Sequence, residues 1–155
     1  MEKSRDDVKR FLSIPMELDR KIYETEEIIE TLRARAAKTT SQLSLAPGGG
    51  SGDKGKVMEE LVIRIDELEQ EAERMRQEKE KAAAEVTLLL SQMPNSAEVK
   101  VLMMHYVELM EFDTIGSRLN YGERYVYKLH LRGLAKAAQI WQKKGSMCRE
   151  VGGHV

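Results

Sequence analysis

The sequence predicts an all-α protein in which a long antiparallel helical hairpin precedes a small helix-turn-helix head. Two observations predict the hairpin: small and apolar residues recur at alternating spacings of four and three along two long segments, and a stretch rich in glycine separates them. A third observation predicts the head, because residues 112–134 hold two short helical patterns joined by turn residues. The expected domains are residues 1–93, residues 94–144 and a flexible tail at 145–155.

The first arm of the hairpin begins after a proline. Residues 1–14 have the pattern of a short helix, which we expect to end near Pro15 because proline lacks the backbone N–H that continues a helix. A heptad seam follows and is interrupted only by threonines. The loop expected at residues 47–55 begins with Pro47 and contains GGGSG. The seam residues are Leu18, Ile22, Thr25, Ile29, Leu32, Ala36, Thr39 and Leu43.

The second arm carries a longer seam with one polar interruption, Lys79. At 1.5 Å per residue the two helices would be roughly 45 and 55 Å long. One seam is thin for a stable monomer, so we expect a homo-oligomer, a dimer, formed through the hairpin. The seam residues are Met58, Leu61, Ile65, Leu68, Ala72, Met75, Lys79, Ala82, Val86, Leu89 and Met93.

Pro94 is expected to end the second arm, and a helix over about residues 96–110 follows. Asn95 is a suitable N-cap, and Glu98 stands where a capping-box partner belongs. The inward positions of this helix are expected to be Val99, Leu102, Met103, Tyr106 and Met110.

The helix-turn-helix is predicted from a small residue, a turn residue and four spaced apolar positions. Gly116 lies inside the first helix, where two helices that cross closely need a small residue, although one methyl group could be admitted. Asn120 tolerates the left-handed conformation that a tight turn requires. Tyr121 is expected to plug the turn. The apolar positions are Ile115, Leu119, Val126 and Leu129.

Positive charge is concentrated in this region. Residues 112–149 contain eight Lys or Arg and two acidic residues, whereas the whole chain has a net charge of −1. Arg124, Lys128 and Arg132 repeat every four residues and form a basic stripe on the second helix, which is expected to continue to about Lys144. Tyr125 and Tyr127 flank the stripe and can reach phosphates, sugars or bases. The pattern favours binding of double-stranded DNA; the alternative is a basic amphipathic helix that only closes a bundle.

Signals for other chemistry are weak. Residues 50–56, GSGDKGK, match the spacing of a phosphate-binding loop, but Val57 replaces the Ser or Thr that would bind magnesium and no βαβ pattern surrounds it. The three histidines, His105, His130 and His154, lack metal-ligand spacing. No nucleophile–base arrangement stands out. We therefore expect no enzyme activity, no metal and no cofactor.

The ends of the chain and its single cysteine indicate a compartment. The N-terminal residues MEKSRDDVKR are charged throughout, which predicts no secretory signal, and no apolar run approaches the roughly 20 residues of a membrane helix. Cys148 is the only cysteine, which excludes an internal disulfide. These features predict a cytoplasmic protein.

The segment FDTIGSRLNYGERYVYKLHLRGLAK resembles region 4 of the sigma-70 family, a helix-turn-helix that reads a promoter element. The similarity is closer to small phage and prophage proteins with such a head, the ArpU/RinA-like late transcriptional regulators. Three features depart from that pattern: Gly122 replaces a capping Ser, Phe112-Asp113 replaces Ser-Trp, and the small residue of Leu131-Arg132-Gly133 is shifted relative to the Gly-x-Ala of those proteins. The matching pieces are HYVE at 105–108, TIG at 114–116, RLNY at 118–121, YVYKLH at 125–130 and Leu134.

The resemblance implies roles for particular side chains. By analogy with region 4, Glu123, Arg124, Tyr127 and Lys128 would face bases, and Arg118 and Arg132 would contact phosphates. The function it implies is a sequence-specific transcriptional regulator that reads the major groove with the helix at about 123–135.

Two other functions remain open. One is a phage DNA-packaging protein similar to a terminase small subunit, which ring-like stoichiometry would favour. The other is a helical adaptor that binds RNA polymerase instead of DNA. Salt-dependent DNA binding would argue against the adaptor.

Overall fold

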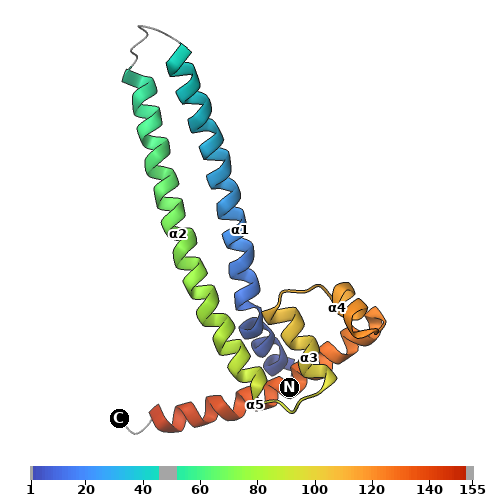
Figure 1. The fold of residues 1–155 in the computed structure, drawn as a ribbon. Coiled ribbons are helices and arrows are strands. Elements are labelled where there is room, and N and C mark those ends of the chain that lie inside the picture. The colour runs from blue at the N-terminus through green and yellow to red at the C-terminus, as the bar shows by residue number, and fades with distance from the viewer. Residues whose placement is uncertain (1, 46–51, 153–155) are drawn as a thin grey trace. The chain divides into compact units, whose positions relative to one another are not determined.

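The computed structural model describes the backbone of residues 2–45 and 52–152 and the side chains of residues 5–41 and 55–141 (Figure 1). Within these residues the regular structure is helical and contains no strand, which confirms the predicted all-α class. The elements are α1 (Glu2–Leu45), α2 (Gly52–Ser91), α3 (Ala97–Leu102), the π-helical turn η1 (Met103–Val107), α4 (Phe112–Leu119) and α5 (Glu123–Gly152).

Packing divides the chain into two units. The hairpin unit is Leu18–Glu78, and the head unit combines Met1–Glu17 with Lys79–Val155. The boundary expected after residue 93 therefore lies inside the head unit. The first turns of α1 and the last turns of α2 belong to the head because their apolar side chains are buried in its core.

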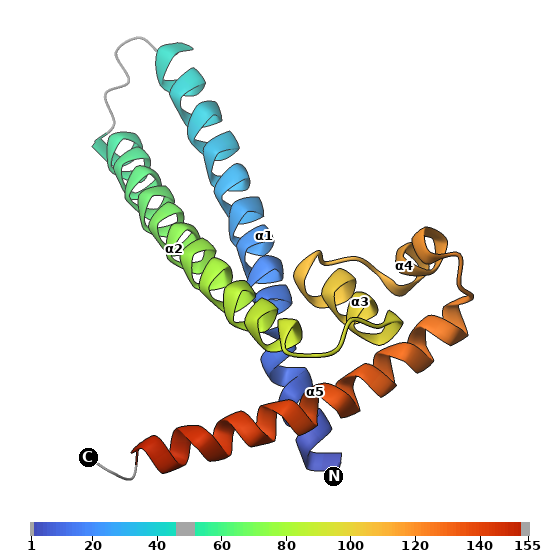
Figure 2. The same cartoon turned by 60° about the horizontal axis from the view of Figure 1, so that its bottom comes forward.

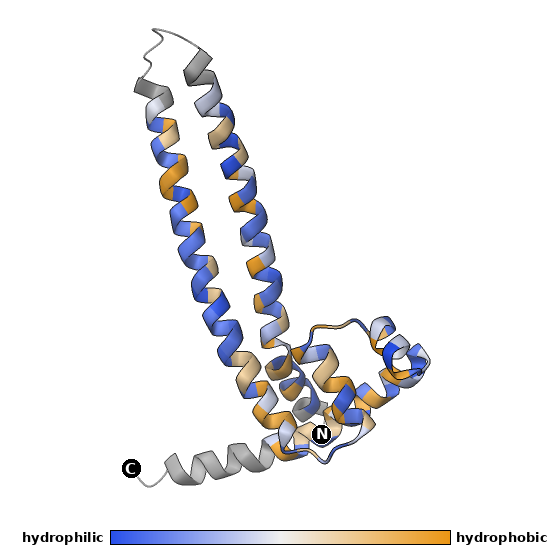
Figure 3. Ribbon diagram, in the orientation of Figure 1, coloured by the Kyte–Doolittle hydropathy of each residue, from blue (hydrophilic) through white to orange (hydrophobic). Residues whose placement is uncertain are grey.

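The hairpin unit consists of two antiparallel helical arms that lie side by side (Figure 1). Hydrophobic positions recur along both arms among hydrophilic ones (Figure 3). Each predicted seam position from Leu18 to Thr39 and from Met58 to Met75 is buried or half-buried, so the heptad interpretation is confirmed there. Leu43 lies outside the described side chains.

Ion pairs also join the two arms. Arg33 pairs with Glu69, and Arg76 pairs with Glu26 at 2.6 Å. All four side chains are about half exposed, and exposed ion pairs of this kind contribute at most about 1 kcal/mol each. The apolar seam therefore stabilises the pairing of the arms, and the ion pairs agree with its register.

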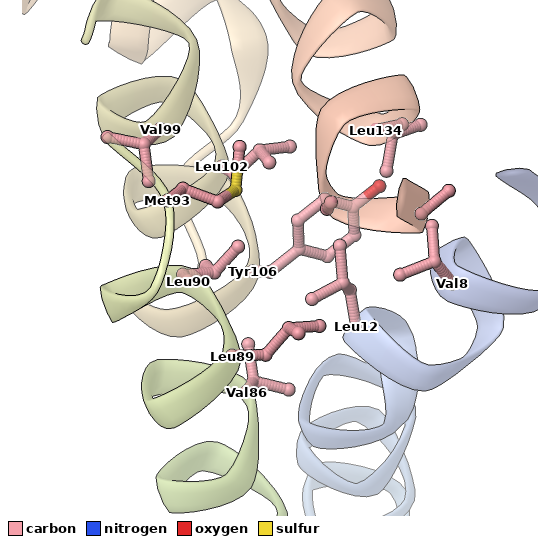
Figure 4. Close-up of a cluster of buried hydrophobic side chains, with 12 residues drawn as sticks. Val8, Leu12, Val86, Leu89, Leu90, Met93, Val99, Leu102, Tyr106 and Leu134 are labelled. Atoms are coloured by element: carbon pink, nitrogen blue, oxygen red, sulfur yellow. The ribbon is translucent and has the colours of Figure 1, made fainter. Parts of the chain in front are cut away.

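The core of the head unit surrounds one aromatic side chain. Tyr106 is 1% exposed, and Figure 4 shows Leu12, Leu89 and Leu102 near its ring. The buried members of this cluster come from α1, α2, α3, η1 and α5: Val8, Leu12, Val86, Leu89, Leu90, Met93, Val99, Leu102, Tyr106, Leu134, Ala137 and Ala138.

The prediction that the first helix ends near Pro15 is wrong. α1 runs from Glu2 to Leu45 with Pro15 inside it. A proline within a helix costs about 3 kcal/mol through the lost hydrogen bond and a steric clash. Leu12 and Val8 are fully buried one and two turns earlier, and the proline ring is buried as well, so tertiary contacts offset that cost.

Two expected irregular segments are shorter than predicted. α2 begins at Gly52, so part of the expected loop at 47–55 is helical, while residues 46–51, including Pro47, lie outside the described backbone. α5 continues to Gly152, so residues 145–152 are helical where a tail was expected. Gly145 alone, at about 1 kcal/mol relative to alanine, is too weak a signal to end a helix.

The helix expected at 96–110 is replaced by α3 and η1. Ser96, and not Asn95, is the N-cap: its backbone is extended and its Oγ accepts a hydrogen bond from the N–H of Val99 at 3.4 Å. This one-residue shift removes Glu98 from the capping-box position. Tyr106, in η1, is buried in the core, as predicted for an inward position.

Candidate nucleic-acid interface

The turn between α4 and α5 has the conformation predicted for it. Asn120 ends α4 in the left-handed region, with φ 58° and ψ 42°. The backbone N–H groups of Asn120 and Tyr121 both donate to the carbonyl oxygen of Gly116, the second at 2.9 Å. Asparagine tolerates this conformation better than most residues that have a Cβ atom. The turn is therefore stabilised by its own backbone hydrogen bonds.

Gly116 is buried where that turn folds back. A Cβ atom at this position would lie 2.7 Å from the carbonyl oxygen of Tyr121 and 3.5 Å from Cγ2 of Val126. The need for a small residue is confirmed. The expectation that one methyl group could be admitted is wrong, because the nearest neighbour is a backbone atom of the turn, which cannot move independently of it.

The expectation that Tyr121 plugs the turn is also wrong. Its side chain is 38% exposed and packs edge-to-face on Tyr125, with ring centroids 4.9 Å apart. A small hydrophobic core packs against α4 and α5 next to the turn instead. That core contains Val101, Ile115, Val126 and Leu129, with Phe112, Leu119 and other half-buried side chains around it.

This core orients α5 so that one side of its first three turns is exposed. All seven predicted DNA-contacting side chains are exposed: Arg118, Glu123, Arg124, Tyr125, Tyr127, Lys128 and Arg132. Six of them lie on α5, while Arg118 lies in the last turn of α4. Four of the seven are cations: Arg118, Arg124, Lys128 and Arg132. In the part of the chain that the structure describes, none of these four has an ion-pair partner. Their charges are available to an external anion.

Two tyrosines on this face are supported by neighbouring rings. Tyr127 is 52% exposed and contacts Phe112 edge-to-face at 6.0 Å, while Tyr125 is 44% exposed against Tyr121. Such contacts restrict the rings without burying them. An amphipathic ring held this way can contact a sugar or a base at low conformational cost.

The sequence patterns did not predict a polar contact between His130, on the buried side of α5, and Tyr106. His130 is 3% exposed, and its Nε2 lies 2.6 Å from the hydroxyl of Tyr106. Its Nδ1 has no hydrogen-bond partner among the described residues. His105 packs against His130 edge-to-face, stacks on Phe112, and lies 2.8 Å through Nδ1 from the carbonyl oxygen of Met110. No spacing in the sequence distinguishes the buried His130 and the half-buried His105 from two surface histidines.

Burial decides the protonation of this cluster. Desolvation lowers the pKa of His130 to about 4, with smaller contributions from the charges of His105 and Lys9. Desolvation lowers the pKa of His105 and raises that of the Tyr106 hydroxyl. Both histidines are thus neutral at pH 7 and add no charge to the basic stripe.

A second glycine brings α5 close to α3. A Cβ atom on Gly133 would lie 3.0 Å from Cγ and Cδ1 of Leu102 and 3.3 Å from the carbonyl oxygen of Glu98. Nearby, the Lys136 Nζ pairs with a Glu98 carboxylate oxygen at 3.1 Å. This hydrogen bond, and to a smaller extent one from Ser96, lowers the pKa of Glu98. Gly133 therefore sets the distance between α3 and α5.

Other kinds of site find no geometric support in the described residues. No group of three His, Cys, Asp or Glu side chains there could hold a metal ion. No described helix joins sufficient length to sufficient apolarity to cross a membrane. Comparisons with models of protein families, with curated proteins and with solved structures find no significant match to this chain. The resemblance to sigma region 4 therefore rests on the matching residues alone.

Proposed function

We propose that this protein binds double-stranded DNA with the exposed face of α5 and regulates transcription, as a phage or prophage regulator with a sigma-region-4-like head would. The observation that supports the proposal most is a turn closed by backbone hydrogen bonds next to a helix side with unpaired positive charge. Gly116 and Asn120 hold α4 and α5 in one arrangement, and Arg124, Lys128 and Arg132 project from α5 without ion-pair partners in the described chain.

An exposed helix side such as the start of α5 suits the major groove. A helix fits the groove, and its first turns then contact base edges. Residues 123–132 supply both donors and acceptors for base edges. Arg124 and Lys128 can donate to guanine O6 and N7, and Glu123 can accept from cytosine N4. Arg118, in the last turn of α4, and Arg132, one turn after Lys128 on α5, would contact phosphates by analogy with region 4.

The hairpin unit would bring two heads together. Palindromic half-sites about one helical turn apart require a dimer, and a paired helical arm is a suitable dimerisation element. The described seam side chains of the hairpin unit are already buried or half-buried within one chain, so a second copy would contact the outer sides of the arms.

Selection from a random pool of duplexes with the full-length protein tests the proposal. We expect enrichment of one short motif, repeated if the protein acts as a dimer, with affinity that falls as salt rises. A pool that is bound without enrichment would indicate sequence-independent binding, and a pool that is not retained at low salt would reject DNA binding. Ring-like stoichiometry on DNA would instead favour packaging.

A further inference from the structure

The N-terminal turns of α1 pack across α5, directly after the segment that carries the basic stripe (Figure 2). Val8 and Leu12 are fully buried in the same cluster as Leu134, and Phe11 stacks on Trp141 with ring centroids 6.1 Å apart. These contacts lie within the head unit. The start of α1 therefore has a defined position on α5.

This packing leaves two cations of α1 beside the exposed side of α5. Arg5 and Lys9 are one turn apart and, with Asp6, line a depression of about 300 Å³ whose other wall is Leu131 and Leu134. Lys9 is exposed and Arg5 is half-buried. No ion pair involving either cation occurs among the described residues. The influence of the Lys9 charge on the pKa of His130 agrees with this placement.

Leu131 connects the depression to the proposed DNA-binding face. It lies three residues after Lys128 and four after Tyr127, so the three side chains occupy neighbouring positions on one side of α5. Leu131 is 37% exposed and thus belongs to the surface and not to the core. Arg5 and Lys9 extend the basic stripe sideways, across Leu131, onto a second helix.

We propose that Arg5 and Lys9 contact the DNA phosphates that border the groove occupied by α5. The inference rests on the proposed function and adds the N-terminal helix to the binding surface. In helix-turn-helix complexes the recognition helix lies in the major groove while another helix of the same domain crosses the sugar–phosphate backbone, and we assign a similar place to the start of α1. Cations there contribute affinity and orientation but no sequence discrimination. Asp6 reduces the local charge without cancelling it.

Salt titrations of the full-length protein test this with matched variants. Lys9→Gln keeps a polar side chain of similar helix propensity but removes the charge. Lys9→Arg keeps the charge, and Arg10→Gln removes a charge from an exposed position outside the depression. For Lys9→Gln we expect the slope of log K against log salt to become shallower by about 0.9, equally on selected and random duplexes. Lys9→Arg and Arg10→Gln should retain the wild-type slope.

The outcomes separate this inference from the proposed function. If wild type binds the selected duplex and Lys9→Gln retains its slope, the N-terminal helix does not contact phosphate, and the role of α5 stands. Equal slope changes for Lys9→Gln and Arg10→Gln would show a general effect of net charge and also overturn the inference. If wild type binds no duplex, both fall together. Thermal melting of each variant checks that the fold is kept, which is expected because Lys9 and Arg10 are exposed.

Discussion

Gly116 shows how one position can reverse the usual effect of a substitution. Helix propensity predicts that Gly→Ala stabilises an exposed helix by up to about 1 kcal/mol. At Gly116 the added Cβ would lie 2.7 Å from the Tyr121 carbonyl oxygen, so the turn would have to move.

We therefore expect Gly116→Ala to lower the free energy of unfolding by about 1–3 kcal/mol through overpacking, and Gly116→Val to lower it further. Gly55→Ala is the matched control, because Gly55 lies in α2 with no atom near its missing Cβ and should be neutral or stabilised. Urea denaturation measures both. A Gly116→Ala protein as stable as the control would mean that the turn does not pack on Gly116.

The buried histidine predicts loss of stability in mild acid. His130 has a folded pKa of about 4, below its ordinary value of about 6.5, so the folded state favours the neutral ring. The unfolded chain then binds the proton first, and the contribution of His130 is complete above pH 6.5 and declines as pH falls toward 4. His105, whose pKa is also lowered, acts in the same direction.

Between pH 7 and pH 5 we expect His130 to contribute a loss of about 2 kcal/mol in the free energy of unfolding. Denaturation of wild type and of His130→Gln at both pH values gives this contribution as the difference between their pH dependences. The variant should be less stable at pH 7 but should vary less with pH. Parallel pH dependences would show that the ring of His130 is not protonated differently in the two states.

For whole elements, the regular spacing of apolar residues predicted the long helices correctly. The predictions of where helices begin and end were wrong where tertiary packing outweighs the local preference of a single residue. The seams were predictable because each described position from Leu18 to Thr39 and from Met58 to Met75 follows one spacing, and burial follows spacing on a paired helix. Asn120 was predictable because few residues adopt the left-handed turn.

The errors at this scale have specific physical causes. Pro15 was expected to break a helix, but buried neighbours offset its cost. Asn95 and Ser96 are adjacent residues of equal capping ability, and the sequence does not choose between them. Nothing in the sequence signals that η1 is a π-helical turn, or that it places Tyr106 against His130. These contacts depend on residues 24 positions apart in sequence.

α5 predicts different effects for its three stripe residues. Arg124→Ala and Lys128→Ala should each weaken binding of the selected duplex by about 1–3 kcal/mol and relax discrimination at one base position. Arg132→Ala should weaken selected and random duplexes alike, because a phosphate contact carries no sequence information. Competition titrations measure both effects. Equal losses on both duplexes for all three variants would contradict the assignment of Arg124 and Lys128 to bases.

For the molecule as a whole, the core of the head unit includes side chains from the start of α1 and from the end of α2. Tyr106 and Leu134 pack with Val8 and Leu12 from α1 and with Leu89 from α2. A fragment of residues 94–155 lacks these partners. We expect it to lose the cooperative thermal unfolding of the full chain, as followed by circular dichroism. A fragment that melts as cooperatively as the full chain would restore the boundary expected after residue 93.

The oligomeric state remains a prediction at this scale. Light scattering of the full chain at micromolar concentration should give a mass above that of the monomer, because a hairpin with one seam buries little surface for its length. Ala72, at the centre of the α2 seam, is a small side chain, which makes the seam thin there. A monomeric mass at that concentration would mean that each head binds its site alone.

Binding of duplex DNA by the exposed face of α5 can be tested in a single titration. Full-length protein is titrated into labelled selected and random duplexes, and fluorescence anisotropy is read across salt concentrations from roughly 50 to 200 mM, the range in which phosphate contacts change affinity by orders of magnitude. We expect tighter binding of the selected duplex at each salt concentration and a linear fall of log K with log salt for both duplexes. Absence of binding at the lowest salt, or affinity independent of salt, would contradict it.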